Sequence, residues 1–211
     1  MSALAVVSAG IGQPSSTRLL ADRLAAATSA ALGGDVAVET VELRDHAHAL
    51  ADAAVTGFPS GTFRTAVQTV ADAGGLIAVT PVFNASYSGL FKMFFDVLER
   101  DALDGKPVLL GATGGTPRHS LAIDYAMRPL FAHLRAAVVP TAVYAASEDW
   151  GGADPPAAGA GPYAGGPDPL AERVTRAGTE LAALMSDRPA PAKADPYDDP
   201  VPFEDLLAGG R

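Results

Sequence analysis

The segment best suited to ligand chemistry spans residues 80–92 and reads Thr80-Pro81-Val82-Phe83-Asn84-Ala85-Ser86-Tyr87-Ser88-Gly89-Leu90-Phe91-Lys92. Its polar centre offers the Asn84 amide and the Ser86 hydroxyl, with an aromatic ring on either side. An apolar run precedes it at 76–79 and an amphipathic pattern follows at 90–100, so we expect it to join a buried strand to a helix. Open α/β sheets bind ligands beyond the carboxyl ends of their strands. This mixture of groups suits a flat heteroaromatic ligand better than a metal ion.

The plainer interpretation of the same segment is a loop followed by a helix cap. Phe91, Phe94 and Phe95 recur at the spacing of one buried helix face, so we expect them to fill the core rather than to bind a ligand. That argument does not account for Asn84 and Ser86, which are therefore kept as candidates for ligand contact.

A second candidate is the loop Ser8-Ala9-Gly10-Ile11-Gly12-Gln13-Pro14-Ser15-Ser16-Thr17-Arg18, which follows the first predicted strand. Its two glycines let the backbone turn, Ser15 or Ser16 can cap the next helix, and Thr17 adds a hydroxyl. Free N–H groups and the positive end of the helix dipole would then meet where a phosphate could bind. An ordinary helix cap explains the same residues. The glycine spacing matches neither a P-loop nor a dinucleotide-binding fingerprint.

A third loop, residues 112–120, follows the fourth predicted strand. It contains Thr113-Gly114-Gly115, and adjacent glycines let a backbone pass closely against a planar ring. A strand-to-helix turn capped by Ser120 is the plainer alternative. Arg118-His119 fits a solvated pair at a helix start as well as a contact to the phosphate of a nicotinamide nucleotide. The histidines share no metal-ligand spacing with acidic residues, so we predict no metal site.

The composition excludes several classes of protein. The chain has 211 residues, of which 48% are hydrophobic, enough to bury one good core. A net charge of −9 argues against a general nucleic-acid binder or a binder of anionic membranes. The absence of cysteine excludes disulfides, thiolate catalysis and cysteine-ligated metals. No apolar run approaches the roughly 20 residues that a bilayer needs, and the first residues lack a basic leader, so we expect a cytoplasmic protein.

Strand and helix patterns alternate along the chain. The predicted strands span residues 3–8, 36–43, 75–80, 108–113 and 138–145, and the predicted helices span 15–32, part of 44–56, 62–73, 88–100, 121–136 and 168–186. This alternation requires right-handed crossovers and a parallel sheet covered by helices on both faces. Five strands favour a flavodoxin-like three-layer sandwich with strand order 2-1-3-4-5, in which the three loops converge at one edge of the sheet.

The three loops resemble those of the NADPH-dependent FMN reductase family of flavodoxin-like proteins, and the resemblance covers residues 3–145 and the helix that ends at 186. In that family the loop after the third strand reads Pro-x-Tyr-Asn-Gly-Ser-x-Pro-Gly-x-x-Lys-Asn, with an Asp three residues later. The matching positions here are Pro81, Phe83, Asn84, Ala85, Ser86, Ser88, Gly89, Lys92, Met93 and Asp96. The first loop of the family reads Gly-Ser-x-Arg-x-x-Ser-x-Asn-Arg. Ser15, Thr17 and Arg18 match its end, whereas glycine or glutamine replaces the loop arginine.

The resemblance implies a reductase that transfers hydride from NADPH or NADH to FMN, with no side chain acting as a catalytic acid or base. The implied phosphate ligands are Ser8, Ser15, Ser16, Thr17 and Arg18. The implied ring contacts are Pro81, Val82, Phe83, Asn84, Ser86 and Tyr87, with Thr113, Gly114 and Gly115 closing the site. The resemblance also implies a homodimer or homotetramer, for which an exposed face around Phe91 and the acidic tail are candidate contacts.

Residues 1–186 are then expected to form one FMN-binding domain that includes a Gly/Pro-rich loop at 147–169, and residues 187–211 an acidic, proline-rich tail. The leading hypothesis is an NAD(P)H-dependent FMN reductase that supplies reduced flavin to a partner monooxygenase. An FMN-containing quinone or azo reductase, a flavodoxin-type electron carrier and a flavin-free binding module are the alternatives. No membrane or nucleic-acid partner is expected.

Overall fold

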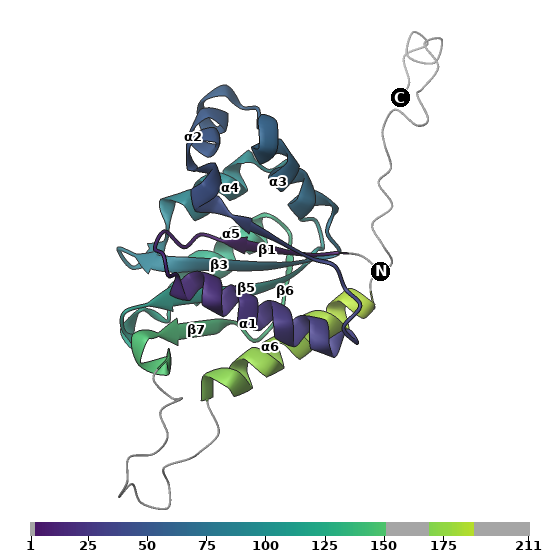
Figure 1. Ribbon diagram of the computed structural model, residues 1–211, viewed down its shortest axis with the longest axis vertical. Helices are drawn as coiled ribbons and strands as arrows, with labels where there is room; N and C mark the ends of the chain where they lie inside the picture. Colours follow the sequence, from purple (N-terminus) through teal and green to yellow (C-terminus); the bar gives the residue numbers. More distant parts are fainter. Residues whose placement is uncertain (1–2, 151–168, 188–211) are drawn as a thin grey trace, which may run out of the picture.

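A computed structural model of the chain describes residues 3–150 and 169–187, and it has a parallel sheet between two layers of helices (Figure 1). The tail expected at 187–211 and the loop expected at 147–169 lie almost entirely outside the described residues. Within the described ranges no helix is long and apolar enough to cross a membrane.

The described part of the chain forms one sheet of seven strands. The strands are β1 (Leu4–Ser8), β2 (Val38–Glu42), β3 (Gly75–Phe83), β4 (Ser86–Tyr87), β5 (Pro107–Gly114), β6 (Ala137–Val138) and β7 (Val143–Ala146). The order β2-β1-β3-β5-β6 has parallel pairing throughout, and β7 also pairs in parallel with β5. The predicted flavodoxin-like order is therefore confirmed. The sheet has seven strands rather than five because β4 forms a hairpin with β3 and because the edge strand is split.

The split edge strand consists of β6 and β7, which pair with opposite ends of β5. Pro140 lies between them and has no N–H to donate, so the fifth predicted strand cannot run through this point. The Arg128 guanidinium donates to the carbonyls of Val139 and Pro140 at 3.2 and 2.5 Å. The Glu180 carboxylate accepts a hydrogen bond from the Thr141 N–H at 2.7 Å. The polar groups exposed by the break are thus satisfied by side chains.

The described helices largely follow the prediction. They are α1 (Ser16–Ala31), α2 (Ala47–Thr56), α3 (Gly61–Asp72), α4 (Gly89–Val97), α5 (Arg128–His133) and α6 (Pro169–Ser186), with short 3₁₀ turns at Leu43–His46, Pro117–His119 and Ser147–Trp150. The helix expected at 121–136 differs, because it begins as a π-helical turn at Ile123–Met127 and becomes α-helical at Arg128. Pro129 follows at once and has no N–H for the preceding turn, which accounts for the irregular start.

Each face of the sheet has its own hydrophobic core. α1 and α6 cover one face and α2, α3, α4 and α5 cover the other (Figure 1). α1 and α6 lie in direct contact, and a Cβ atom added at Gly178 would lie 2.8 Å from the Cβ of Ala27. Phe91, Phe94 and Phe95 are buried in the second core, so the prediction that they fill the core is confirmed. The expectation of an exposed contact face around Phe91 is wrong.

Lys106 is a buried cation at the start of β5, with 3% of its surface exposed. Its Nζ donates to the carbonyls of Val70 and Ala71 at 2.6 and 2.8 Å, in the last turn of α3. These carbonyls have no partner within the helix, and a positive charge is favourable at a helix C-terminus. Lys106 therefore joins α3 to the central sheet.

We expect Lys106→Met to lower the free energy of unfolding by about 2 kcal/mol, because two buried carbonyls lose a charged donor. Lys92→Met is the matched control, since Lys92 is partly exposed and pairs with Asp96 one helical turn away. That substitution should cost less than about 0.5 kcal/mol. Urea unfolding followed by circular dichroism measures both values, and equal losses would contradict the structural role of Lys106.

Candidate functional site

The three loops singled out in the sequence meet at one edge of the sheet and enclose a pocket of about 360 Å³. The pocket lies beyond the carboxyl ends of β1, β3 and β5, where sheets of this class bind ligands. Its lining residues are Ile11, Gly12, Pro14, Ser15, Ser16, Thr17, Pro81, Val82, Phe83, Thr113, Gly114, Gly115, Ser147 and Trp150. We call it the three-loop pocket.

α1 begins at this pocket. Ser15 caps the helix, and its Oγ accepts a hydrogen bond from the Arg18 N–H at 3.2 Å. Ser16 and Thr17 follow in the first turn, which contains no acidic residue. Gly10 lets the loop pass over the cap, since a Cβ there would lie 2.1 Å from the Ser15 Oγ. Free N–H groups and the helix dipole give this end of the pocket a partial positive charge that favours an anion.

A buried pair of hydroxyls joins the first and third loops. The Oγ1 atoms of Thr17 and Thr113 are 2.8 Å apart, and both side chains are buried. Hydrogen bonds between buried partners are costly to leave unmade, so each hydroxyl fixes the other. The pair holds the first turn of α1 against the end of β5.

The second loop is a β-hairpin made by β3 and β4. Asn84 and Ala85 form its turn with φ values of 49° and 65°, as a two-residue type I′ turn requires. An alanine at a positive φ costs about 1 kcal/mol, so strand pairing must hold this turn in place. Pro81, Val82 and Phe83 of β3 line the three-loop pocket.

Three predicted ring contacts in the hairpin lie outside the pocket lining. Asn84 is exposed at the tip, and Ser86 lies on the return strand β4. The Tyr87 ring packs against the core, with its centre 5.8 Å from that of Phe91. In this structure the pocket wall therefore comes from the outgoing strand of the hairpin rather than from its tip.

Tyr144 of β7 holds the third loop in place. Its hydroxyl donates to the Thr116 carbonyl at 2.7 Å, and a Cβ at Gly114 would lie 2.1 Å from the same oxygen. Burial raises the pKa of the Tyr144 phenol, and the Asp149 carboxylate raises it further. The hydroxyl therefore keeps its proton and stays a donor. Gly114 and Gly115 have no side chains and so present only backbone to the pocket.

The Ser147–Trp150 turn forms a wall of the pocket that sequence reasoning missed. The Asp149 carboxylate accepts from Arg173 of α6 at 3.1 Å. The Arg23 guanidinium of α1 lies 5.1 Å from the centre of the Trp150 ring. Both contacts join segments that are far apart in the chain, so no local sequence pattern predicts them. The one available signal was that Trp150 is the only tryptophan in the sequence.

Nine of the fourteen predicted site residues line the three-loop pocket, namely Ser15, Ser16, Thr17, Pro81, Val82, Phe83, Thr113, Gly114 and Gly115. Ser8 is fully buried at the end of β1, and its Oγ has no hydrogen-bond partner among the described residues. Arg18 forms ion pairs with Asp22 and Glu42. Its pKa is raised, and the largest cause is the hydrogen bond to Asp22. Its charge is thus balanced within the protein and is not presented to the pocket.

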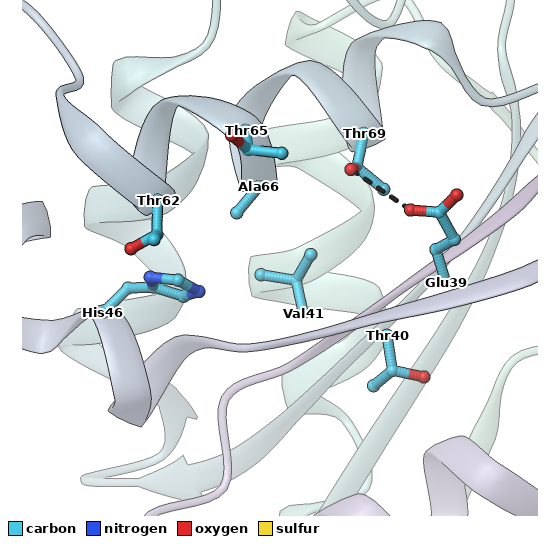
Figure 2. A pocket seen from close by; sticks show the side chains of 8 residues that line it. All are labelled: Glu39, Thr40, Val41, His46, Thr62, Thr65, Ala66 and Thr69. Carbon is cyan, nitrogen blue, oxygen red and sulfur yellow. Dashed lines mark hydrogen bonds between the residues drawn. The ribbon is translucent and has the colours of Figure 1, made fainter.

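A second hollow, of about 270 Å³, lies between β2 and α3 (Figure 2). Thr62, Thr65 and Thr69 of α3 line it, and the Thr69 hydroxyl donates to the Glu39 carboxylate at 3.4 Å. Among the described residues that line it there is no glycine or helix N-terminal serine, and Glu39 would repel a phosphate. The three-loop pocket is therefore the better candidate for an anionic ligand.

Arg118 and His119 line a third hollow, of about 240 Å³, together with Ala85 of the hairpin tip and Tyr125. Neither residue belongs to the lining of the three-loop pocket. Their contact to the phosphate of a nicotinamide nucleotide stays a prediction.

The two ends of the three-loop pocket differ in a way that fits FMN. One end has hydroxyls and backbone donors at the start of α1, which suit a phosphate. The other has the apolar side chains of Val82 and Phe83 beside the bare backbone of Gly114 and Gly115, which suits a flat ring. The volume also falls within the range of pockets that hold small molecules.

The chain as a whole is similar to known proteins. Residues 2–151 match the family model described as NADPH-dependent FMN reductase. A protein of Pseudomonas aeruginosa named FMN reductase (NADPH) is 37% identical over 144 residues, which cover 68% of this chain and 76% of that protein. The NADH-dependent FMN reductase SfnF of Pseudomonas putida is 37% identical over 143 residues, with the same coverage of 68% and 76%.

Solved structures with the same architecture include an oxidoreductase from Corynebacterium diphtheriae. It is 42% identical, with a TM-score of 0.79 over 90% of this chain and 99% of that one. An NADH:FMN oxidoreductase in its apo form is 28% identical, with a TM-score of 0.74 over 90% of this chain and 92% of that one. A WrbA-like flavodoxin from Agrobacterium tumefaciens is 16% identical with a TM-score of 0.52 over 88% of this chain and 96% of that one, and so shares the fold alone.

We expect Gly10→Ala to raise the Kd for FMN about tenfold or more, because its Cβ would displace the Ser15 cap at the start of α1. Gly89→Ala is the matched control, since a Cβ at Gly89 meets nothing within 4 Å. Titration of flavin fluorescence measures both constants. Equal affinities for the two variants would argue against the role of the first loop.

We expect FMN to quench the tryptophan fluorescence of the protein, because the single tryptophan, Trp150, lines the pocket. Trp150→Phe should abolish the emission signal while FMN remains able to bind, as followed by flavin fluorescence. Emission unchanged at saturating FMN would place the flavin away from the Ser147–Trp150 turn.

Proposed function

The chain belongs to the NADPH-dependent FMN reductase family, whose members use FMN with NADPH or NADH as electron donor, and we propose that its three-loop pocket is where FMN binds. The observation that carries the proposal is the lining itself. Hydroxyl and backbone donors at the start of α1 stand opposite an apolar wall, and none of the lining residues that the structure describes is charged. Bound FMN supplies the hydride acceptor, and the protein supplies position and environment.

The phosphate end is formed by Ser15, Ser16 and Thr17 with the first-turn N–H groups of α1. The Thr17–Thr113 hydroxyl pair sets the distance between this end and the third loop. Such a site recognises a dianion by donors and by the helix dipole rather than by a cation in contact with it.

The ring end is formed by Val82 and Phe83 on one side and by Gly114 and Gly115 on another. Phe83 is half-exposed, so this end opens toward solvent and leaves room for a nicotinamide to approach. Hydride transfer needs no proton from a side chain, and no residue with a strongly shifted pKa is required. The contribution of these residues is to orient the ring and to limit water around it.

We further propose that reduced flavin leaves the protein and serves a separate monooxygenase. A phosphate held by neutral donors in an open pocket binds less tightly than one paired with arginine or lysine. Such a flavin exchanges, which suits a reductase whose product is used elsewhere. The competing hypothesis is a flavodoxin-type carrier or a quinone reductase, because either would retain FMN during turnover.

A homo-oligomer is also proposed. Leu121 and Tyr125 are exposed by 59% and 79% beside the hairpin tip, and a neighbouring subunit would cover them. An exposed apolar surface at Leu121 and Tyr125 is consistent with the dimer or tetramer that the resemblance implies.

We expect NADPH or NADH oxidation to rise with added free FMN and to saturate at micromolar concentrations, with reduced flavin recovered in the filtrate of an anaerobic ultrafiltration. The absorbance at 340 nm follows the donor, and the filtrate spectrum follows the flavin. FMN that stays with the protein through turnover would favour the carrier or quinone-reductase hypothesis. Absence of FMN binding would exclude the assignment of the pocket.

A further inference from the structure

We propose that Arg44 is a positioning residue for the phosphate-binding loop, which it holds in shape from the 3₁₀ turn that follows β2. The inference rests on the proposed function, because it concerns how the same pocket recognises FMN. The loop from Ile11 to Thr17 contains no basic residue. Arg44 lies 32 residues from Gly12 in sequence, yet its side chain contacts the loop directly.

The guanidinium of Arg44 holds the loop at two neighbouring residues. Its Nη1 donates to the Gly12 carbonyl at 3.0 Å. The Gln13 amide lies beside it, and in the orientation that satisfies both groups its oxygen accepts from Nη1 and Nη2 at 3.0 and 2.8 Å. Planar, forked donors of this kind fix the geometry of their partners better than a point charge does.

The contact with the Gly12 carbonyl also sets the direction of a backbone donor. The Gly12–Gln13 peptide is trans, so its C=O and N–H point in opposite directions. With the carbonyl turned toward Arg44, the Gln13 N–H is turned to the opposite side of the loop. Gly12 itself lines the three-loop pocket. Arg44 therefore determines which polar groups of this peptide are available there.

Arg44 is in turn held by a network of charges. Its Nη2 lies 3.2 Å from the Glu42 carboxylate, and its Nε lies 3.4 Å from that of Asp45. Glu42 also pairs with Arg18, which reaches Asp22 on α1. The network thus joins β2, the loop and the first turns of α1.

This arrangement differs from an ordinary surface ion pair. The side chains of Arg44 and Glu42 are 20% and 16% exposed, whereas those of Arg135 and Asp104 in a pair elsewhere are 79% and 43% exposed. Exposed pairs contribute little to stability, and many of them contribute nothing measurable. Arg44 donates a hydrogen bond to a backbone carbonyl and also forms ion pairs with carboxylates, so its loss frees a segment of the loop.

The consequence is a specific effect on the phosphate group. FMN and riboflavin share the ring and the ribityl chain and differ in the phosphate. A residue that organises the phosphate loop must therefore affect FMN binding more than riboflavin binding. A residue needed only for the stability of the fold would affect both ligands alike.

The test compares Arg44→Gln, Arg44→Lys and the control Arg135→Gln by titration with FMN and with riboflavin. We expect Arg44→Gln to raise the Kd for FMN about tenfold, as for the loss of a charge-assisted hydrogen bond, and that for riboflavin less than about twofold. Arg44→Lys keeps the charge without the fork and should give an intermediate ratio. Arg135→Gln should leave both constants unchanged.

Two failures are distinguishable. If the wild-type protein binds neither flavin, the proposed function fails and the variants are not needed to decide it. If wild-type binds FMN, an unchanged ratio of the two constants in Arg44→Gln overturns the role of Arg44, and so does an equal loss for both ligands. Should Arg44→Gln fail to fold by circular dichroism, Arg44→Lys decides in the same way through its ratio.

Discussion

The site depends on the parallel register of β1, β3 and β5. Ser8 lies opposite Val79, and Thr80 lies opposite Ala112, so the three strands leave the sheet at nearly the same level. Because every crossover returns to the same end of the sheet, each loop begins where its neighbours begin. A slip of one residue in either pairing would move the side chains of each core to the other face of the sheet and would shift the loops relative to one another. The two cores, one on each face, are what prevent that slip.

The electrostatic design of the pocket follows from this arrangement. The lining residues that the structure describes are uncharged, and Arg18 and Arg44 are engaged with carboxylates or with backbone. The anion-binding potential therefore comes from the start of α1, whose first turn has no acidic side chain. Charged groups act from behind the loop by holding it in shape. In an acidic chain this keeps the site open to a phosphate without concentrating positive charge on the surface.

Features that depend on the local sequence pattern were predicted correctly. Apolar runs and helical spacing predicted the strand order and the buried phenylalanines, and the motif around Pro81 predicted the family. The sequence was a poor guide to the hairpin, because Asn84-Ala85 lacks the glycine that marks a type I′ turn. It gave no warning of Arg44 or Trp150, because their contacts reach the loop and α1 across long stretches of chain. Such long-range contacts have no period for a pattern to detect.

The split edge strand also bears on how copies of the protein behave in a crowded solution. A long unpaired strand edge is a template for pairing with another chain and so for aggregation. Here the outer edge beside β5 is two residues of β6 and four of β7, separated by Pro140. Arg128 and Glu180 occupy the polar groups at the gap. An incoming strand would find no continuous ladder along this part of the edge, so the break works against self-association through the sheet.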